Sequence, residues 1–178
     1  MRPLADAPAR ATVRPPELHT DGRFLLEGEL GRGGMGVVYR ARDSATGRQI
    51  ALKRLSNKAK ARHVALFERE YYTLASLKHP NVVAALDYGA DAEGPWYAME
   101  LLEGGDLAQA APLPWPEVCR ILNYVASALG MLHARRLLHR DISARNVWRT
   151  PDGQIKLIDF GALSAFGRSG DLTGTPPF

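Results

Sequence analysis

The chain has 178 residues, of which 46% are hydrophobic, so it can bury one core or two small lobes and is not a disordered chain. Its 23 basic and 19 acidic side chains leave a formal charge of +4, a modest excess that is spread out except between residues 53 and 62. No nucleic-acid-binding pattern accompanies that cluster, so we expect a solvated helix face there and no nucleic-acid partner.

The N-terminal segment and the single cysteine bear on location. Residues 1–20 are rich in Pro, Arg and Ala and lack the apolar centre of a signal peptide, so we expect a flexible leader. No membrane segment is expected, because no uninterrupted apolar run is long enough to span a bilayer. Cys119 excludes an internal disulfide and suits a reducing cytoplasm, and its apolar helical surroundings predict a buried small hydrophobe.

Residues 21–102 carry the signals of a small lobe. Apolar, β-branched runs separated by turn residues predict five strands, at 24–30, 37–42, 49–55, 82–88 and 96–101. Apolar side chains at three- and four-residue steps predict a helix over 60–77. These steps are made by Val64, Phe67, Tyr71, Leu74 and Leu77.

The pattern changes from residue 103 onward. A helix is predicted over 116–134, with its apolar residues placed on one side: Val118, Ile121, Leu122, Val125, Leu129 and Leu132. Short strands are predicted around 146–148 and at 155–158, with a Pro-Asp-Gly turn between them. The fold class is therefore α+β, an antiparallel five-stranded lobe with one main helix followed by a helical part.

Residues 31–36 read Gly-Arg-Gly-Gly-Met-Gly, the G-x-G-x-x-G pattern. In a dinucleotide site such glycines follow a strand and open a helix. Here the strand-like residues 37–41 follow, so the glycines lie at the tip of a hairpin. Glycines at that place let the backbone approach phosphates, although an ordinary hairpin turn explains the motif when it is taken alone.

The segment 139–146 reads His-Arg-Asp-Ile-Ser-Ala-Arg-Asn, and Asp-Phe-Gly follows at 159–161. It supplies Asp141, which can accept a proton from a hydroxyl group. It also supplies Asn146, and Asp159 follows; their oxygens are the kind of ligand that Mg²⁺ prefers. A positioned nucleophile and a bound Mg²⁺ are what phosphoryl transfer requires.

With these motifs the chain resembles the bacterial eukaryotic-type (Hanks-type) serine/threonine protein kinases over about residues 24–178. The motifs Ile-Ala-Leu-Lys at 50–53, His-Pro-Asn at 79–81 and Gly-Thr-Pro-Pro-Phe at 174–178 add to the likeness. The resemblance implies a protein-kinase-like fold over 21–178, with the small lobe at about 21–102 and an incomplete helical large lobe at about 103–178. It also implies ATP, Mg²⁺ and protein substrates, whose identity the sequence does not give.

The resemblance also implies the roles of individual residues. Lys53 would neutralise the α- and β-phosphates and be held by a glutamate of the next helix. Glu68 and Glu70 are both candidates, and the family spacing favours Glu70. Asp141 would accept the substrate proton, and Asn146 and Asp159 would hold Mg²⁺. The implied catalytic set is Asp141, Lys53, Glu70, Arg145 and Asn146.

The implied nucleotide site lies between the two lobes. Met99 would be the gatekeeper, the backbones of Glu100 and Leu102 would bond the adenine, and Asp106 would meet the ribose. The full set is Gly31, Gly33, Gly36, Val38, Ala51, Lys53, Met99, Glu100, Leu102, Asp106 and Trp148. Arg140 would pair with a phosphorylated hydroxyl of the tail. The candidates for that hydroxyl are Thr173 and, behind it, Ser164 and Ser169.

Three positions depart from the family pattern. Ser143 replaces a lysine, and Arg145 could supply its charge as in the tyrosine-kinase form of the loop, so dual specificity stays open. Trp148 replaces a smaller leucine under the adenine, which predicts a displaced base or a partly filled pocket. Ala85 replaces a larger apolar residue, which predicts loose packing in the stack of Leu74, Ala85, His139 and Phe160.

The family continues beyond the Gly-Thr-Pro segment into further helices, whereas this sequence stops at Phe178. We therefore expect the helix at 116–134 to expose apolar surface, covered by a partner or by a missing segment. The leading interpretation is ATP-dependent phosphorylation of serine and threonine hydroxyls. The alternatives are an inactive nucleotide-binding fragment or scaffold, and a small-molecule kinase of the aminoglycoside phosphotransferase type.

Overall fold

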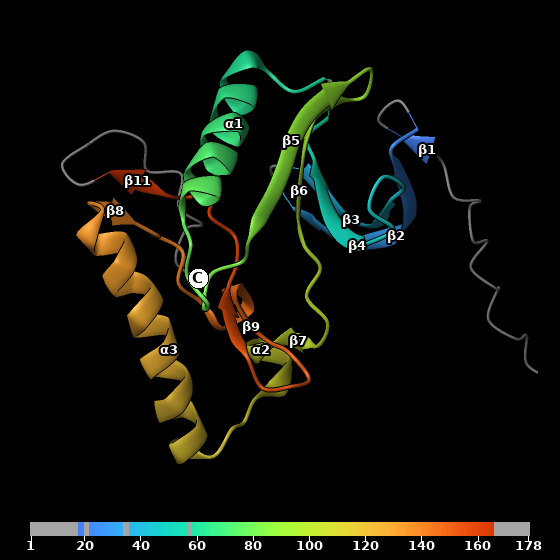
Figure 1. The fold of residues 1–178 in the computed structure, drawn as a ribbon. Coiled ribbons are helices and arrows are strands. Elements are labelled where there is room, and N and C mark those ends of the chain that lie inside the picture. The colour runs from blue at the N-terminus through green and yellow to red at the C-terminus, as the bar shows by residue number, and fades with distance from the viewer. Residues whose placement is uncertain (1–17, 20–21, 34–35, 57, 166–178) are drawn as a thin grey trace, which may run out of the picture.

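The computed structural model describes residues 18–19, 22–33, 36–56 and 58–165. Gly34 and Met35 of the glycine motif lie outside the described residues, and so do most of the predicted leader and the tail with Thr173 and Ser169. The described elements fall into a strand-rich part that precedes the lobe connection and a mixed part that follows it (Figure 1).

The small lobe is a six-stranded antiparallel sheet with the strand order β1-β2-β3-β4-β6-β5. Its strands are β1 (Leu18–His19), β2 (Phe24–Gly33), β3 (Gly36–Asp43), β4 (Gln49–Arg54), β5 (Ala85–Asp91) and β6 (Gly94–Glu100). The five predicted strands are present, and the two-residue β1 adds one edge strand. The protein-kinase-like arrangement of a five-stranded antiparallel lobe with one main helix is confirmed.

One strand boundary was predicted wrongly. The run 82–88 was expected to be a strand of the sheet, but β5 begins only at Ala85. Val82 and Val83 are buried and pair with Leu157 of the large lobe instead, through a parallel bridge and a 3.1 Å bond from the Val83 N–H to the Leu157 carbonyl. A buried apolar segment can pair with the small-lobe sheet or with the large lobe. Here the contact with the large lobe prevails over continuation of the strand.

The main helix of the small lobe is α1 (Ala61–Ser76), within the predicted range of 60–77. It lies beside β5 (Figure 1) and buries Phe67, Glu70 and Leu74. Phe67 and Leu74 are apolar, whereas Glu70 is charged. Because a buried charge is unfavourable unless it is paired, Glu70 is expected to have a polar partner on a neighbouring element.

The large lobe contains α3 (Trp115–Ala134) and several short elements. These are β7 (Gly105–Asp106), α2 (Leu107–Ala110), β8 (Leu137–Leu138), the 3₁₀ turn η1 (Ala144–Asn146), β9 (Val147–Arg149), β10 (Ile155–Leu157) and β11 (Ser164–Ala165). β7, β9 and β10 form a three-stranded sheet, and β8 pairs with β11. The two strands predicted on either side of the Pro-Asp-Gly turn are β9 and β10.

The apolar side chains of α3 lie on two faces, not on the single side that was predicted. The buried face carries Ile121, Val125, Ala128 and Leu132. Trp115 is 77% exposed and Leu122 is 58% exposed, on the outward face of the same helix. With 3.6 residues in a turn, Leu122 is rotated about 100° from Ile121, so only one of the two can face the core. The expected exposed apolar surface is present.

Two further expectations about burial were wrong. Cys119 is exposed, because it follows Val118 on the outward part of α3. The basic cluster at 53–62 is not one solvated helix face: Lys53 and Arg54 lie in β4, and the Arg54 side chain is buried. Arg54 donates to both carboxylate oxygens of Asp91, at 2.6 and 2.8 Å, so burial is accompanied by pairing.

The main core crosses from one lobe to the other. It includes buried side chains of α1 and β6 together with those of α3, β9 and β10. A second, smaller core around Phe24, Leu52 and Trp96 covers the other face of the sheet. Because one continuous core joins the lobes, the segments between them are held in a fixed relation. Within the described residues, no helix has both the length and the apolar character needed to cross a membrane.

Candidate active site

One face of the small-lobe sheet carries the side chains that the resemblance assigns to the nucleotide. Directly opposite residues of an antiparallel pair share a face, and every second residue of a strand returns to it. The observed register therefore brings five of the predicted contacts onto one face: Gly31, Val38, Ala51, Lys53 and Met99. They come from four strands, and only the pairing of those strands brings them together.

The glycines of the hairpin are explained by two different features. A Cβ added at Gly31 or at Gly33 would meet open space, so the backbone on this side leaves room for a ligand. Gly36 has a φ of +143°, and its Cβ would overlap the backbone oxygen of Arg54 in the adjacent strand. Glycine at 36 is therefore required by the close approach of β3 and β4, whatever binds at the hairpin.

Lys53 lies between two carboxylates. Its Nζ is 2.7 Å from Oε1 of Glu70 and 3.9 Å from Oδ1 of Asp159. Glu68, the other candidate on α1, instead accepts a 2.8 Å hydrogen bond from the hydroxyl of Tyr88. Of the two glutamates left open by the sequence, the structure therefore pairs Glu70 with Lys53.

Tyr97 is a member of this cluster that the sequence reasoning missed. Its buried hydroxyl donates to Oε1 of Glu70 at 2.8 Å, the same oxygen that Lys53 contacts. Burial raises the pKa of Tyr97 well above its ordinary value, and the negative charge of Glu70 adds to that effect. The available signal was its position two residues before Met99, which puts it on the face of Lys53.

The predicted proton acceptor and a predicted metal ligand are directly bonded. The side-chain amide of Asn146 donates to both the backbone oxygen and Oδ2 of Asp141, each at 2.9 Å. The backbone of Asn146 is bonded in turn to the residue that follows β10, because its carbonyl accepts from the N–H of Ile158 at 2.9 Å. These bonds fix the shape of the loop. Both bonds to Asp141 are made by the side-chain nitrogen of Asn146, and its side-chain oxygen Oδ1 takes no part in them.

Asp159, a predicted metal ligand, has an unusual backbone conformation. Its φ of +59° is unusual for a residue with a side chain, and its Oδ1 accepts from the backbone N–H of Gly161 at 3.2 Å. Asn146 and Asp159 supply the oxygen donors that Mg²⁺ prefers. No group of three or more His, Cys, Asp or Glu side chains is placed to hold a metal among the residues that the structure describes.

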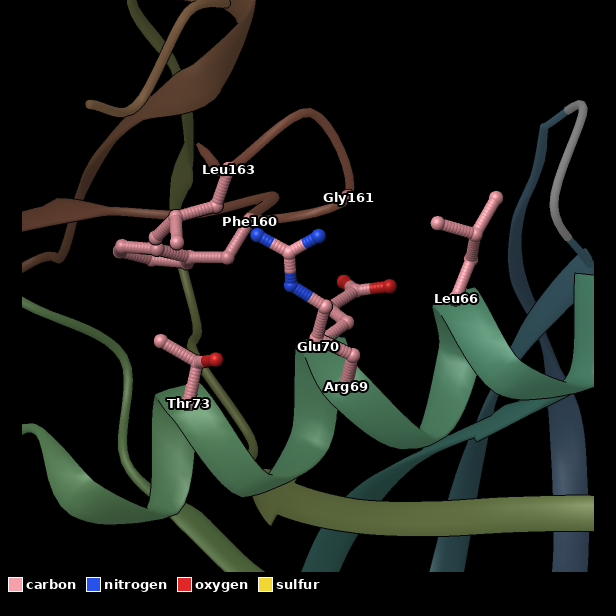
Figure 2. A pocket seen from close by; sticks show the side chains of 7 residues that line it. All are labelled: Leu66, Arg69, Glu70, Thr73, Phe160, Gly161 and Leu163. Carbon is pink, nitrogen blue, oxygen red and sulfur yellow. The ribbon is translucent and has the colours of Figure 1, made fainter. Parts of the chain in front are cut away.

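Phe160, which follows Asp159, is packed against His139. Their ring centroids are 4.8 Å apart at an angle of 62°, and both side chains are buried. Burial lowers the pKa of His139 below its ordinary value. A cavity of about 10 Å³ remains beside Phe160, between α1 and the segment after β10. Figure 2 shows its lining residues, Leu66, Arg69, Glu70, Thr73, Phe160, Gly161 and Leu163.

The predicted loose stack has one partly buried member. Leu74, His139 and Phe160 are buried, whereas Ala85 at the start of β5 is only partly buried. The cavity beside Phe160 has room for no more than about one water molecule.

Two residues of the lobe connection already have polar partners in the protein. The carboxylate of Glu100 accepts from the N–H of Ala84 at 2.7 Å and from Nζ of Lys156 at 2.8 Å. Asp106 caps α2, because its carboxylate accepts from the backbone N–H of Gln109 at 3.0 Å. These bonds fix both side chains at the ends of the connection.

Trp148 is turned toward the same connection. Its indole N–H donates to the carbonyl of Glu103 at 3.0 Å, and the Glu103 carboxylate contacts Arg40 of β3 at 2.8 Å. The Arg40 guanidinium holds the pKa of Glu103 below its ordinary value. Neither Arg40 nor Glu103 belongs to a motif, so the sequence gave no signal for this contact.

The remaining candidates lie at the edge of the site or outside it. Arg145 is exposed within η1, and Ser143, just before that turn, is exposed as well. Ser164 lies in β11 opposite Leu138, with its hydroxyl buried and without a hydrogen-bond partner among the residues that the structure describes. Of the three hydroxyls considered for phosphorylation, Ser164 is therefore shielded, and the other two lie outside the described residues.

The family described as "protein kinase domain" matches residues 24–178 of this chain. The chain belongs to the protein kinase family. This match covers both lobes of the site, from the first strand before the glycine hairpin to the segment that follows Asp-Phe-Gly. The resemblance inferred from the motifs is thereby confirmed.

Several bacterial proteins are similar to this chain. It is 38% identical over 171 residues to the DNA damage-responsive serine/threonine-protein kinase RqkA of Deinococcus radiodurans, a match that covers 88% of this chain and 25% of RqkA. It is 40% identical over 164 residues to the serine/threonine-protein kinase PknF of Mycobacterium tuberculosis, covering 85% and 34% respectively. It is 34% identical over 160 residues to the probable serine/threonine-protein kinase PknB of Lactococcus lactis, covering 86% and 25%. The chain thus spans about a quarter to a third of the length of these relatives.

Proposed function

We propose that this chain transfers the γ-phosphate of ATP to serine and threonine hydroxyls of proteins, with Asp141 as the proton acceptor. The observation that carries the proposal is the placement of Lys53, 2.7 Å from Glu70 and 3.9 Å from Asp159. A lysine held between two carboxylates next to an open glycine hairpin is positioned to receive phosphate oxygens.

ATP would lie between the two lobes. Val38 and Ala51 would cover the base from the small lobe, Met99 would bound it at the back, and Trp148 would lie beneath it. The backbones of Glu100 and Leu102 would bond the adenine edge, and Asp106 would meet the ribose. The sheet register supports this placement, because Val38, Ala51 and Met99 share the face of Lys53.

Asn146 and Asp159 fit Mg²⁺ by their chemistry, since both offer oxygen donors; Asp159 lies 3.9 Å from Lys53, and Asn146 bonds to Asp141. Asn146 and Asp159 would hold the ion, which would supply positive charge to offset the negative charge of the phosphates. Asp141 would orient the substrate hydroxyl and take its proton. The hydroxyl oxygen then forms a bond to the γ-phosphorus while the bond from phosphorus to the β–γ bridging oxygen breaks, and ADP leaves.

Serine and threonine are the proposed acceptors because the relatives are named serine/threonine-protein kinases. Arg145 would supply positive charge near the γ-phosphate in place of the missing lysine at Ser143, and it keeps dual specificity open. The single cysteine suits a reaction in the reducing cytoplasm, where ATP is also available.

A second candidate function is a nucleotide-binding fragment or scaffold without transfer activity. The outward apolar side chains Trp115 and Leu122 of α3 favour it, because exposed apolar surface of this kind commonly docks another protein. A kinase acting on small molecules is the third candidate, and a panel of protein and aminoglycoside acceptors would separate it from the first.

The test is transfer of labelled γ-phosphate from Mg-ATP to the chain itself and to a generic protein substrate. Asp141→Asn is the matched control, because it keeps an oxygen for the Asn146 amide and removes the proton acceptor. We expect transfer to fall about 10²- to 10⁴-fold in the variant. A folded chain that binds Mg-ATP and transfers nothing would support the second candidate and overturn the first.

A further inference from the structure

Glu103 joins two parts of the molecule that are distant in sequence. Its carboxylate accepts from both Nη atoms of Arg40 in β3, at 2.8 and 3.4 Å. Its backbone carbonyl accepts from the indole N–H of Trp148 in β9 at 3.0 Å. One residue of the lobe connection therefore ties a strand of the small lobe to an aromatic ring of the large lobe.

Arg40 starts from the face of the sheet that carries the nucleotide candidates. It lies opposite Ala51 in the register and two residues after Val38, so the three side chains share one face. The Arg40 side chain reaches from this face to Glu103, and both partners are partly exposed to solvent. The ion pair thus connects β3 of the small lobe to the segment that joins the lobes.

Trp148 is held on the large-lobe side of Glu103. Its backbone pairs with Asp106 in β7 and with Lys156 in β10. Gly104 has a φ of +102°, and its Cβ would overlap the backbone oxygen of Arg149, so the connection packs directly on β9. With the backbone fixed in this way, the N–H bond to Glu103 also sets the rotation of the indole ring.

We propose that Arg40, Glu103 and Trp148 form a link that fixes the indole ring as a stacking platform for the base of the nucleotide. The inference rests on the proposed ATP site. It adds that the link contributes to the affinity of this site for the base of the nucleotide. The link acts only at the base. Lys53 and Asp159, which would contact the phosphates, lie in other segments than Arg40, Glu103 and Trp148. Stacking on an indole tolerates any purine, so ATP and GTP both gain from the link.

The experiment is titration calorimetry of the full 178-residue chain with Mg-ATP, Mg-GTP and Mg-tripolyphosphate, which lacks the base. Arg40→Gln is compared with Arg42→Gln, a matched control two residues along the same strand. The guanidinium of Arg42 pairs with Glu27 at 3.0 Å, within the small lobe. Trp148→Phe keeps a ring and loses the N–H donor, whereas Trp148→Ala loses the ring as well.

We expect Arg40→Gln to weaken both nucleotides about two- to fivefold, as the loss of an exposed ion pair does, and Arg42→Gln to weaken neither. Trp148→Ala is expected to weaken them about tenfold, with Trp148→Phe between these values. Tripolyphosphate binding stays unchanged in all four variants. The Arg40 effect disappears near 1 M salt, where charges are screened over about 3 Å.

Three results would overturn the link: equal affinities in Arg40→Gln and Arg42→Gln, nucleotide binding by Trp148→Ala as tight as in the wild type, or a parallel loss of tripolyphosphate binding. The last would indicate a general disturbance of the fold. Wild-type chain that binds ATP but transfers no phosphate overturns the kinase proposal and leaves the link standing. Wild-type chain that binds no nucleotide overturns both.

Discussion

Two ion pairs join strands of the small lobe to neighbouring segments, and their nitrogen-to-oxygen distances are nearly the same. Lys53 and Glu70 are 2.7 Å apart, and Arg40 and Glu103 are 2.8 Å apart. Their surroundings differ: the side chains of the first pair are 12% and 2% exposed, and those of the second are 30% and 59% exposed. A buried charge that loses its partner cannot be rehydrated, whereas an exposed one can. Burial, more than distance, therefore decides what each pair contributes to stability.

The largest effect is expected at the buried pair. Lys53→Met leaves the Glu70 carboxylate without its cation, and we expect the free energy of unfolding to fall by about 3–5 kcal/mol. Urea denaturation measures the loss, and phosphate transfer should disappear in the same variant. In the double variant Lys53→Met/Glu70→Leu most of the stability returns, because no buried charge remains. If the loss lay within the error of the measurement, the buried pair would contribute no more to stability than the exposed pair.

Tyr97 sharpens the comparison, since it adds a neutral donor to the buried carboxylate. Tyr97→Phe removes its 2.8 Å bond to Glu70, and we expect a loss of about 1.5–3 kcal/mol in the free energy of unfolding, with slower phosphate transfer. Tyr88→Phe is the matched control, because its hydroxyl makes the same kind of bond to Glu68, two residues before Glu70 on α1 and without a contact to Lys53 among the described residues. Slower transfer in both variants would show that anchoring of α1 in general, rather than Glu70 itself, is responsible.

The smallest effect on the free energy of unfolding is expected from acidification. It concerns His139, a buried group that titrates and belongs to neither ion pair of the comparison above. Burial lowers the pKa of His139, so below about pH 6.5 the unfolded chain binds a proton that the folded chain refuses. Stability is therefore complete above that pH and falls as the pH decreases toward the folded pKa, by at most about 1.4 kcal/mol per pH unit. Urea denaturation between pH 5 and 8 measures the slope. His139→Gln should flatten it, and an unchanged slope in that variant would contradict the assignment.

Much of the fold could be predicted because its signals are local. The five strands and the helices at α1 and α3 follow from the period of the apolar residues, and turn residues separate them. The errors arose where a local pattern fits two partners. Val82 and Val83 suited the sheet but pair with β10, and Leu122 suited the core but faces solvent. Periodicity gives the existence of an apolar face, and only packing decides which residues occupy it.

The catalytic motifs were equally visible in the sequence, because their members are neighbours along the chain. Asp141 and Asn146 are five residues apart and bond directly within one turn. Glu70 needed the structure: it is 17 residues from Lys53, and the family spacing only favoured it over Glu68. Tyr97 is 27 residues from Glu70, and no motif includes it.

The sequence by itself determined the order of the elements, the family and the chemistry of the motif residues, since each depends on side chains close together in the chain. Only the tertiary structure decided which carboxylate Lys53 contacts and which ring Glu103 holds. Arg40 and Trp148 lie 63 and 45 residues from Glu103. Contacts over such separations form where the packing of two lobes brings the strands together, and a pattern read along one strand carries no information about them.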